Sequence, residues 1–103
     1  MIHTTISKNT VTIRLTDERW RHIILLHPNL VEKQQEVLKA VNNPDWILKG
    51  SADELLAVVI ALNTKYLVVV YKESNNDGFI ITAYITTDVK WLFKKEIIWN
   101  KDS

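Results

Sequence analysis

The chain has 103 residues, no cysteine and a formal net charge of +1. These values exclude disulfides, a thiolate nucleophile and a cysteine metal site, and they predict one domain, residues 1–103, around a single core. A nucleic-acid-binding protein of the duplex type usually carries a basic stripe, and none is visible here. No apolar run is long enough to cross a membrane and no signal peptide is visible, so we expect a cytoplasmic protein.

The first half of the chain predicts an extended segment followed by two helices. Residues 10–15 alternate weakly between polar and apolar, which suggests an initial strand or arm. Thr16 precedes two carboxylates and is typical of a helix N-cap. Pro28 ends this first helix and can also open a second one, whose apolar stripe extends to Val41.

The second half predicts consecutive antiparallel strands. Apolar or alternating segments cover residues 45–49, 55–62, 66–73, 79–87 and 96–99. The segment 55–62 is apolar at both parities, which predicts an interior strand at least partly covered on both faces. Helices followed by strands indicate an α+β fold, with two N-terminal helices packed on one face of a four- to five-stranded antiparallel sheet.

A row of hydroxyl groups lies on the segment 79–87. Thr82, Tyr84 and Thr86 alternate with apolar residues, so they share one face of the strand. A hairpin with an even-numbered turn would place Tyr71 beside this row, whereas an odd turn would reverse the partnership, and the sequence leaves both open. Threonine and tyrosine also favour strands on any solvated face, so the row has a purely structural interpretation too.

Two histidines, His22 and His27, are the candidate acid–base groups, because histidine is the side chain whose charge changes near neutral pH. They are five residues apart, roughly 140° around a helix, which argues against a shared metal site. Pro28 breaks the helix and gives His27 freedom to turn toward the sheet. The alternatives are a capping role for His27 and a half-exposed surface position for His22.

The remaining candidates are cations and aromatic rings. Lys72 lies beside Glu73, either as a surface pair or as a cation for a substrate. Lys90 and Trp91 belong to a C-terminal group of lysines and tryptophans, which suits a nucleic-acid contact or a solvated face around core aromatics. The charges in the loop at residues 49–54 have no special spacing. No glycine loop, serine elbow or zinc-ligand spacing occurs, so we expect no metal and no cofactor.

Several segments occur in an order that resembles a known nuclease superfamily. They are Trp20 to Ile23, His27-Pro28, Pro44-Asp45, Leu55 to Ala57, Val68 to Glu73 and Asp77 to Tyr84. Together they resemble the barnase–EndoU–colicin–RelE-like (BECR) nucleases of bacteria and phages, over residues 15–99. The resemblance implies a metal-independent ribonuclease, often a toxin of a toxin–antitoxin or phage-conflict system. Many such toxins are markedly basic, and this chain is not.

The resemblance also implies an active site on the open face of the sheet. The matching catalytic positions are His22, His27, Lys72, Thr82 and Tyr84. The substrate contacts that we expect around them are Tyr71, Thr86, Lys90 and Trp91. The predicted function is an endoribonuclease toxin that cleaves single-stranded mRNA or tRNA, with an antitoxin protein as partner. The alternative is a non-catalytic interaction module that binds a partner, or a second copy of the chain, through a sheet edge or an apolar surface.

Overall fold

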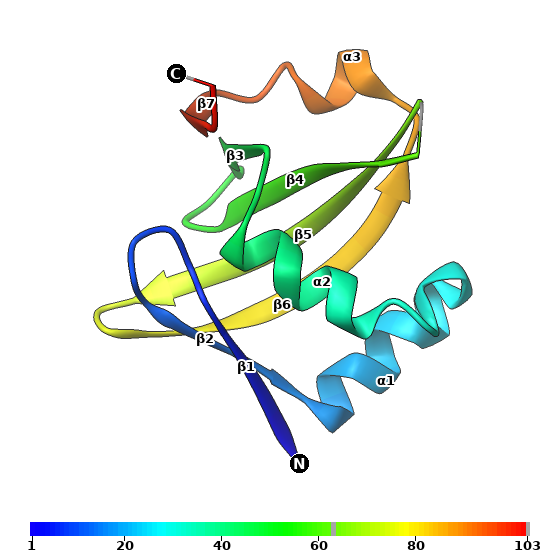
Figure 1. Ribbon diagram of the computed structural model, residues 1–103, viewed down its shortest axis with the longest axis vertical. Helices are drawn as coiled ribbons and strands as arrows, with labels where there is room; N and C mark the ends of the chain where they lie inside the picture. Colours follow the sequence, from blue (N-terminus) through cyan, green and yellow to red (C-terminus); the bar gives the residue numbers. More distant parts are fainter. Residues whose placement is uncertain (63, 103) are drawn as a thin grey trace.

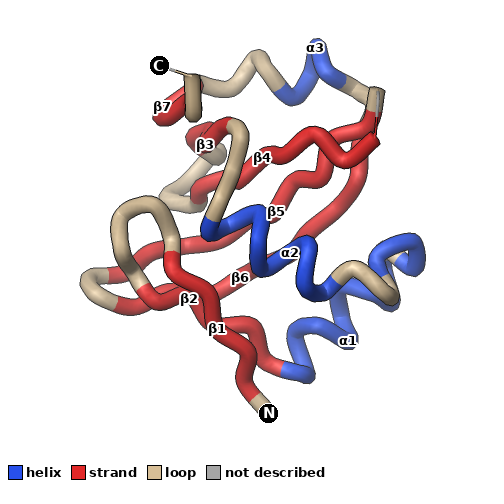
Figure 2. Tube along the Cα trace, viewed as in Figure 1, coloured by secondary structure: helices blue, strands red, loops and turns tan. Residues whose placement is uncertain are grey.

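Strands dominate the computed structural model, which describes residues 1–62 and 64–102 and is shown in Figures 1 and 2. These residues form a seven-stranded sheet, three α-helices and one 3-10 turn. The strands are β1 (Ile2–Ile6), β2 (Thr12–Thr16), β3 (Trp46–Lys49), β4 (Leu55–Leu62), β5 (Lys65–Ser74), β6 (Asp77–Thr86) and β7 (Ile97–Asn100). The helical elements are α1 (Asp17–Leu26), η1 (Pro28–Leu30), α2 (Gln34–Asn42) and α3 (Val89–Leu92). None of these described helices is long and apolar enough to span a membrane.

The sheet is mixed, with the strand order β1-β2-β6-β5-β4-β3-β7. Its one parallel pair among the described strands is β2 with β6, and the other neighbours are antiparallel. The predicted fold, two N-terminal helices on a four- to five-stranded antiparallel sheet, is therefore wrong in the number of strands, in their directions and in what comes first. A β1–β2 hairpin precedes the helices and forms one edge of the sheet.

The helices begin and end at residues with clear physical signals. The Oγ1 atom of Thr16 accepts a hydrogen bond from the Arg19 backbone N–H at 3.1 Å, so Thr16 caps α1 as predicted. The helix ends at Leu26, just before His27 and Pro28. Pro28 opens only the 3-10 turn η1, and α2 starts later than the sequence indicates. The buried residues of α2 are Val37, Leu38, Ala40 and Val41.

The sheet separates two hydrophobic cores. The larger core lies between the sheet and helices α1 and α2, and α2 crosses in front of the sheet in Figure 1. The smaller core lies on the opposite face, where Leu92 and Phe93 pack against β3, β4 and β5. Ala57 of β4 belongs to the larger core, while Leu56 and Val58 belong to the smaller one. The prediction that this strand is covered on both faces is therefore confirmed.

A β-bulge decides which side chains of β5 and β6 share a face. The two strands are joined by a two-residue turn, the even-numbered case, but their register shifts between Val70 and Tyr71. The extra residue on β6 is Ile81, and one extra residue moves the following side chains to the other face. Thr82 and Tyr84 consequently point away from α2, whereas Tyr71 points into the larger core.

Candidate functional site

A groove of about 440 Å³ opens on the face of the sheet that α2 does not cover. Three strands supply its floor: Leu56 from β4, Val70 from β5 and Tyr84 from β6. One wall is the loop between β3 and β4, and the other wall consists of Trp91 and the residues that follow α3. Its volume falls within the range of about 300–1,000 Å³ that is typical of ligand pockets.

Three of the predicted catalytic residues lie on this face. In the β5–β6 pairing, Lys72 lies opposite Phe79, Thr82 opposite Val70, and Tyr84 opposite Val68. Because side chains alternate along a strand, Lys72, Thr82 and Tyr84 all point to the groove side, and each is half-buried. The bulge is what brings the lysine and the two hydroxyl groups onto one face.

His27 lies beside this row of side chains. Its ring centroid is 6.2 Å from that of Tyr84, with the two ring planes tilted by 38°. The backbone N–H of His27 donates to the Ile23 carbonyl at 2.8 Å, which fixes the residue as the C-cap of α1. Burial raises the pKa of Tyr84 above its ordinary value of 10.0, so its hydroxyl stays protonated and can donate a hydrogen bond at neutral pH.

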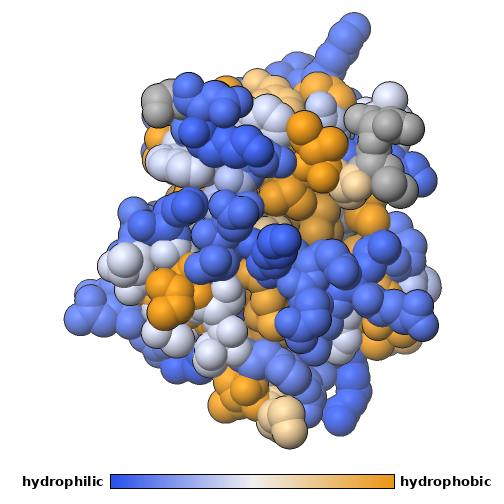
Figure 3. All heavy atoms as spheres, viewed as in Figure 1, coloured by the Kyte–Doolittle hydropathy of each residue, from blue (hydrophilic) through white to orange (hydrophobic). Residues whose placement is uncertain are grey.

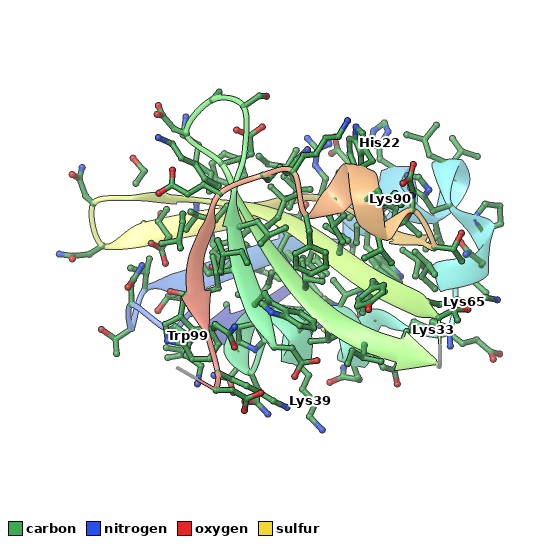
Figure 4. The ribbon with its side chains drawn as sticks, turned by 90° about the horizontal axis from the view of Figure 1, so that it is seen from above. His22, Lys33, Lys39, Lys65, Lys90 and Trp99 are labelled. Atoms are coloured by element: carbon green, nitrogen blue, oxygen red, sulfur yellow. The ribbon has the colours of Figure 1, made fainter. Side chains whose placement is uncertain are left out.

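His22 and Lys90 lie outside the groove. His22 is exposed on the outer side of α1, in a shallow depression that it shares with Glu18, Arg21 and Leu25. Lys90 is exposed on α3. Figure 4 shows both on the side of the sheet opposite Lys39 of α2, but neither lines the groove. The structure therefore separates the two histidines, and only His27 contacts Tyr84.

Neither Tyr71 nor Thr86 lines the groove. Tyr71 is 0% exposed in the larger core, and burial raises its pKa. Its ring cannot stack on a base, so the expected role of Tyr71 in substrate binding is wrong. The reason is the bulge, which turns Tyr71 to the face opposite Thr82 and Tyr84. The Oγ1 atom of Thr86 accepts a hydrogen bond from the Asp88 backbone N–H at 3.0 Å, so this side chain shapes the turn before α3.

The groove also contains charged residues that sequence reasoning did not assign to a site. Lys49 and Glu54 come from the β3–β4 loop, and Lys95 follows α3. A hydrogen bond from the Ala52 backbone N–H, at 2.7 Å, is the main cause that lowers the pKa of Glu54. A side chain at Gly50 would meet Glu54, because an added Cβ would lie 2.4 Å from the Glu54 Cδ atom. Glycine thus allows Glu54 to fold back and hold the loop as a wall of the groove.

A second hollow, of about 390 Å³, lies on the α2 side and is mostly apolar. Its apolar lining comes from the far ends of β4, β5 and β6, with Lys33 and Lys65 among the polar residues. Figure 3 views this side and shows apolar side chains exposed between charged groups. The lining contains neither a histidine nor a tyrosine, whereas Tyr84 lines the groove on the other face and lies beside His27.

Within the described parts of the chain, no three His, Asp or Glu side chains are grouped so that they could hold a metal ion. Comparison with protein-family models, with curated proteins and with solved structures finds no match to this chain. The resemblance to the BECR nucleases stays a prediction. The argument for function consequently rests on the groove and on the side chains that the fold brings to it.

Proposed function

We propose that this protein is an endoribonuclease that needs no metal ion and whose active site is the groove beside Tyr84. The observation that carries the proposal is the ring contact between His27 and Tyr84, at 6.2 Å, on the sheet face that also carries Lys72. A proton acceptor, a protonated hydroxyl and a cation are the groups that an attack on a phosphate by a neighbouring hydroxyl requires.

In this reaction His27 accepts the proton of a ribose 2′-hydroxyl as its oxygen attacks the adjacent phosphorus. The bond from phosphorus to the 5′-oxygen breaks, and water protonates the leaving oxygen. The products are a 2′,3′-cyclic phosphate and a 5′-hydroxyl end. Lys72 stabilises the negative charge of the phosphorane, and Tyr84 and Thr82 donate hydrogen bonds to its oxygens. The nucleophile belongs to the substrate, so no metal-bound water has to be generated.

The charges around the groove support a phosphate ligand. Lys49, Lys72 and Lys95 lie in or beside it, against Glu54 and Glu96. The Glu54 carboxylate accepts a hydrogen bond from the Ala52 backbone N–H, and these three ammonium groups outnumber the two carboxylates. A local excess of positive charge attracts a polyanion even when the whole chain carries a net charge of only +1.

The test is cleavage of a synthetic single-stranded RNA by the purified protein in EDTA. We expect products with cyclic phosphate ends, and we expect His27→Ala to abolish cleavage. His22→Ala is the matched control, because this histidine is exposed on the outer side of the same helix, in a separate depression, whereas His27 lies beside Tyr84. RNA that stays intact with the wild-type protein, or equal cleavage by the His27→Ala variant, would overturn the proposal.

In the cell, the proposal makes the protein a toxin that an antitoxin protein neutralises. Induced expression should then arrest growth, and His27→Ala should relieve the arrest while His22→Ala should not. Co-expression of an inhibitor protein should restore growth without changing the amount of the protein in the cell. Normal growth at high wild-type expression would argue against the toxin role.

A second candidate function is favoured by the edge strand β7. It is the last strand in the described sheet order, and Ile97 and Ile98 are 47% and 50% exposed. An open edge with apolar side chains can pair with a strand of another protein or of a second copy. Growth arrest that survives His27→Ala but disappears in Ile98→Lys would favour this interaction module over the nuclease.

A further inference from the structure

Trp91 is a large aromatic side chain placed on a wall of the groove and left open to solvent. It is 47% exposed, although the next residue, Leu92, is fully buried in the smaller core. The Nζ atom of Lys95 lies 3.9 Å from the centroid of the Trp91 ring. This cation–π contact places the ammonium group over one face of the ring, while about half of the side chain stays exposed to solvent.

Hydrogen bonds fix the backbone at Trp91, and the contact with Lys95 holds its ring. The Oδ1 atom of Asp88 accepts a hydrogen bond from the Trp91 backbone N–H at 3.0 Å and caps α3. Thr86, the last residue of β6, in turn orients Asp88. A ring that is held in place before binding loses little conformational entropy when a ligand stacks on it.

The opposite wall of the groove is polar. It contains Lys49, Gly50 and Ser51, and the folded-back Glu54 supports it. A ligand between the two walls would therefore meet an aromatic surface on one side and backbone, hydroxyl and ammonium groups on the other. This combination suits a nucleobase joined to a phosphate, because every base offers a flat apolar face and a polar edge.

We propose that Trp91 and Lys95 form a subsite for one unpaired RNA base. The base stacks on the exposed part of the Trp91 ring, and Lys95 and Lys49 bind its phosphate. The inference rests on the proposed function, since it places this base next to the phosphate held by Lys72 and Tyr84. A base inside a duplex has both faces covered, so the subsite restricts the enzyme to single-stranded RNA.

The chain offers a matched control for this subsite. Trp99 of β7 also carries a lysine over its ring, with Lys8 Nζ 5.2 Å from the centroid. Trp99 is half-buried and does not line the groove. The two tryptophan–lysine pairs share their chemistry and differ in position, so only the Trp91 pair should respond to a nucleotide.

The experiment measures binding of adenosine 5′-monophosphate and of ribose 5-phosphate to the purified wild-type chain by calorimetry. Neither probe contains a bond between nucleotides, so neither can be cleaved. We expect the nucleotide to bind more tightly than the sugar phosphate. Trp91→Leu should lower the nucleotide affinity about 5- to 160-fold, the range of base–aromatic stacking, whereas Trp91→Phe should keep most of it. Trp99→Leu should change nothing.

The outcomes separate this inference from the proposed function. Equal affinity of the wild-type chain for the two probes, or equal nucleotide affinity in Trp91→Leu and wild type, would overturn the subsite even if RNA is cleaved. A protein that binds the nucleotide in a Trp91-dependent way but leaves RNA intact would overturn the nuclease and keep the subsite. Because Trp91 is exposed, its replacement should not unfold the protein, and thermal unfolding of the variants checks this directly.

Discussion

The two faces of the sheet place the same residue type in opposite surroundings. Tyr71 of β5 points toward α1 and α2, where it is fully buried and its hydroxyl has no hydrogen-bond partner among the described residues. Tyr84 of β6 points the other way, is half-buried and lies beside His27. The covered face supplies stability, while the incompletely covered face leaves polar groups within reach of a ligand.

The difference arises from how much of each face is covered. Helices α1 and α2 pack on the first face and bury the larger core, whereas α3 spans only Val89–Leu92. The segment around α3 covers one end of the second face with a cluster of aromatic rings, in which the ring centroids of Trp46 and Phe93 are 5.1 Å apart. The groove begins where this cover ends.

The largest expected effect is that of His27→Ala on RNA cleavage. Loss of a general base lowers the rate about 10²- to 10⁴-fold. Stability should change by less than about 1 kcal/mol, because the backbone N–H of His27 makes the capping hydrogen bond and remains in the variant. Single-turnover cleavage and urea unfolding of the same preparation measure both quantities. A His27→Ala variant that loses both activity and stability would mean that His27 contributes to the folded core as well as to the open face.

Leu92→Ala should have the next largest effect, this time on stability. Leu92 is fully buried in the smaller core, and removing a buried leucine side chain costs about 2–5 kcal/mol. Val89→Ala is the matched control on the same helix, because Val89 is 38% exposed, and it should cost less than about 1 kcal/mol. Urea unfolding measures both. Equal small losses would show that α3 is not part of the folded core.

The sequence predicts the parts of the fold that have a strong local pattern. The capping hydroxyl at Thr16 and the apolar segment 55–62 both appear in the structure where they were expected. Strand β1 was missed because its half-buried side chains, His3 and Thr5, are polar, so it lacks the apolar alternation that marks a strand. The bulge at Ile81 was missed because it depends on the pairing of two strands and leaves no local pattern.

The same reasoning explains how much of the site the sequence could indicate. Alternation along β6 places Thr82 and Tyr84 together, and Pro28 predicts that His27 leaves the helix. Lys49 and Glu54 join the groove only because the β3–β4 loop folds over the sheet, a tertiary contact without a sequence signal. The turn is the even-numbered case, but the bulge puts Tyr71 on the face opposite Thr82 and Tyr84, and neither register considered from the sequence includes a bulge.

The two tyrosines test the comparison of the faces directly. Tyr84→Phe should lower RNA cleavage about 10- to 100-fold, because a hydrogen bond to the phosphorane is lost, and should leave stability almost unchanged. Tyr71→Phe should leave cleavage unchanged. It should raise the free energy of unfolding by up to about 1 kcal/mol, because it removes a buried hydroxyl without a hydrogen-bond partner among the described residues. Cleavage rates and urea midpoints of both variants decide the matter. The reverse result, with activity lost in Tyr71→Phe, would contradict this assignment of the faces.

The smallest expected effect concerns Asp45, which lies just before β3 and outside the groove. Its Oδ2 atom accepts a hydrogen bond from the Ile60 backbone N–H at 2.9 Å, and its Oδ1 atom lies 2.8 Å from Lys101 Nζ. Burial alone would raise the pKa of Asp45, but the hydrogen bonds from Lys101 and Ile60 outweigh it, so the pKa falls below the ordinary value of 3.8.

The unfolded chain therefore binds a proton at Asp45 more readily than the folded protein does. The carboxylate contributes its full stabilisation above the unfolded pKa, about pH 4, and the contribution is lost as the pH falls through the lower folded pKa. We expect a loss of about 1 kcal/mol, typical of a partly exposed ion pair with one backbone hydrogen bond. Urea unfolding between about pH 6 and pH 3 should show a steeper decline for the wild type than for Asp45→Asn. Cleavage near neutral pH should be the same in both, because Asp45 stabilises the scaffold and does not line the groove. A loss of activity in Asp45→Asn would mean that the region around Asp45 affects the groove.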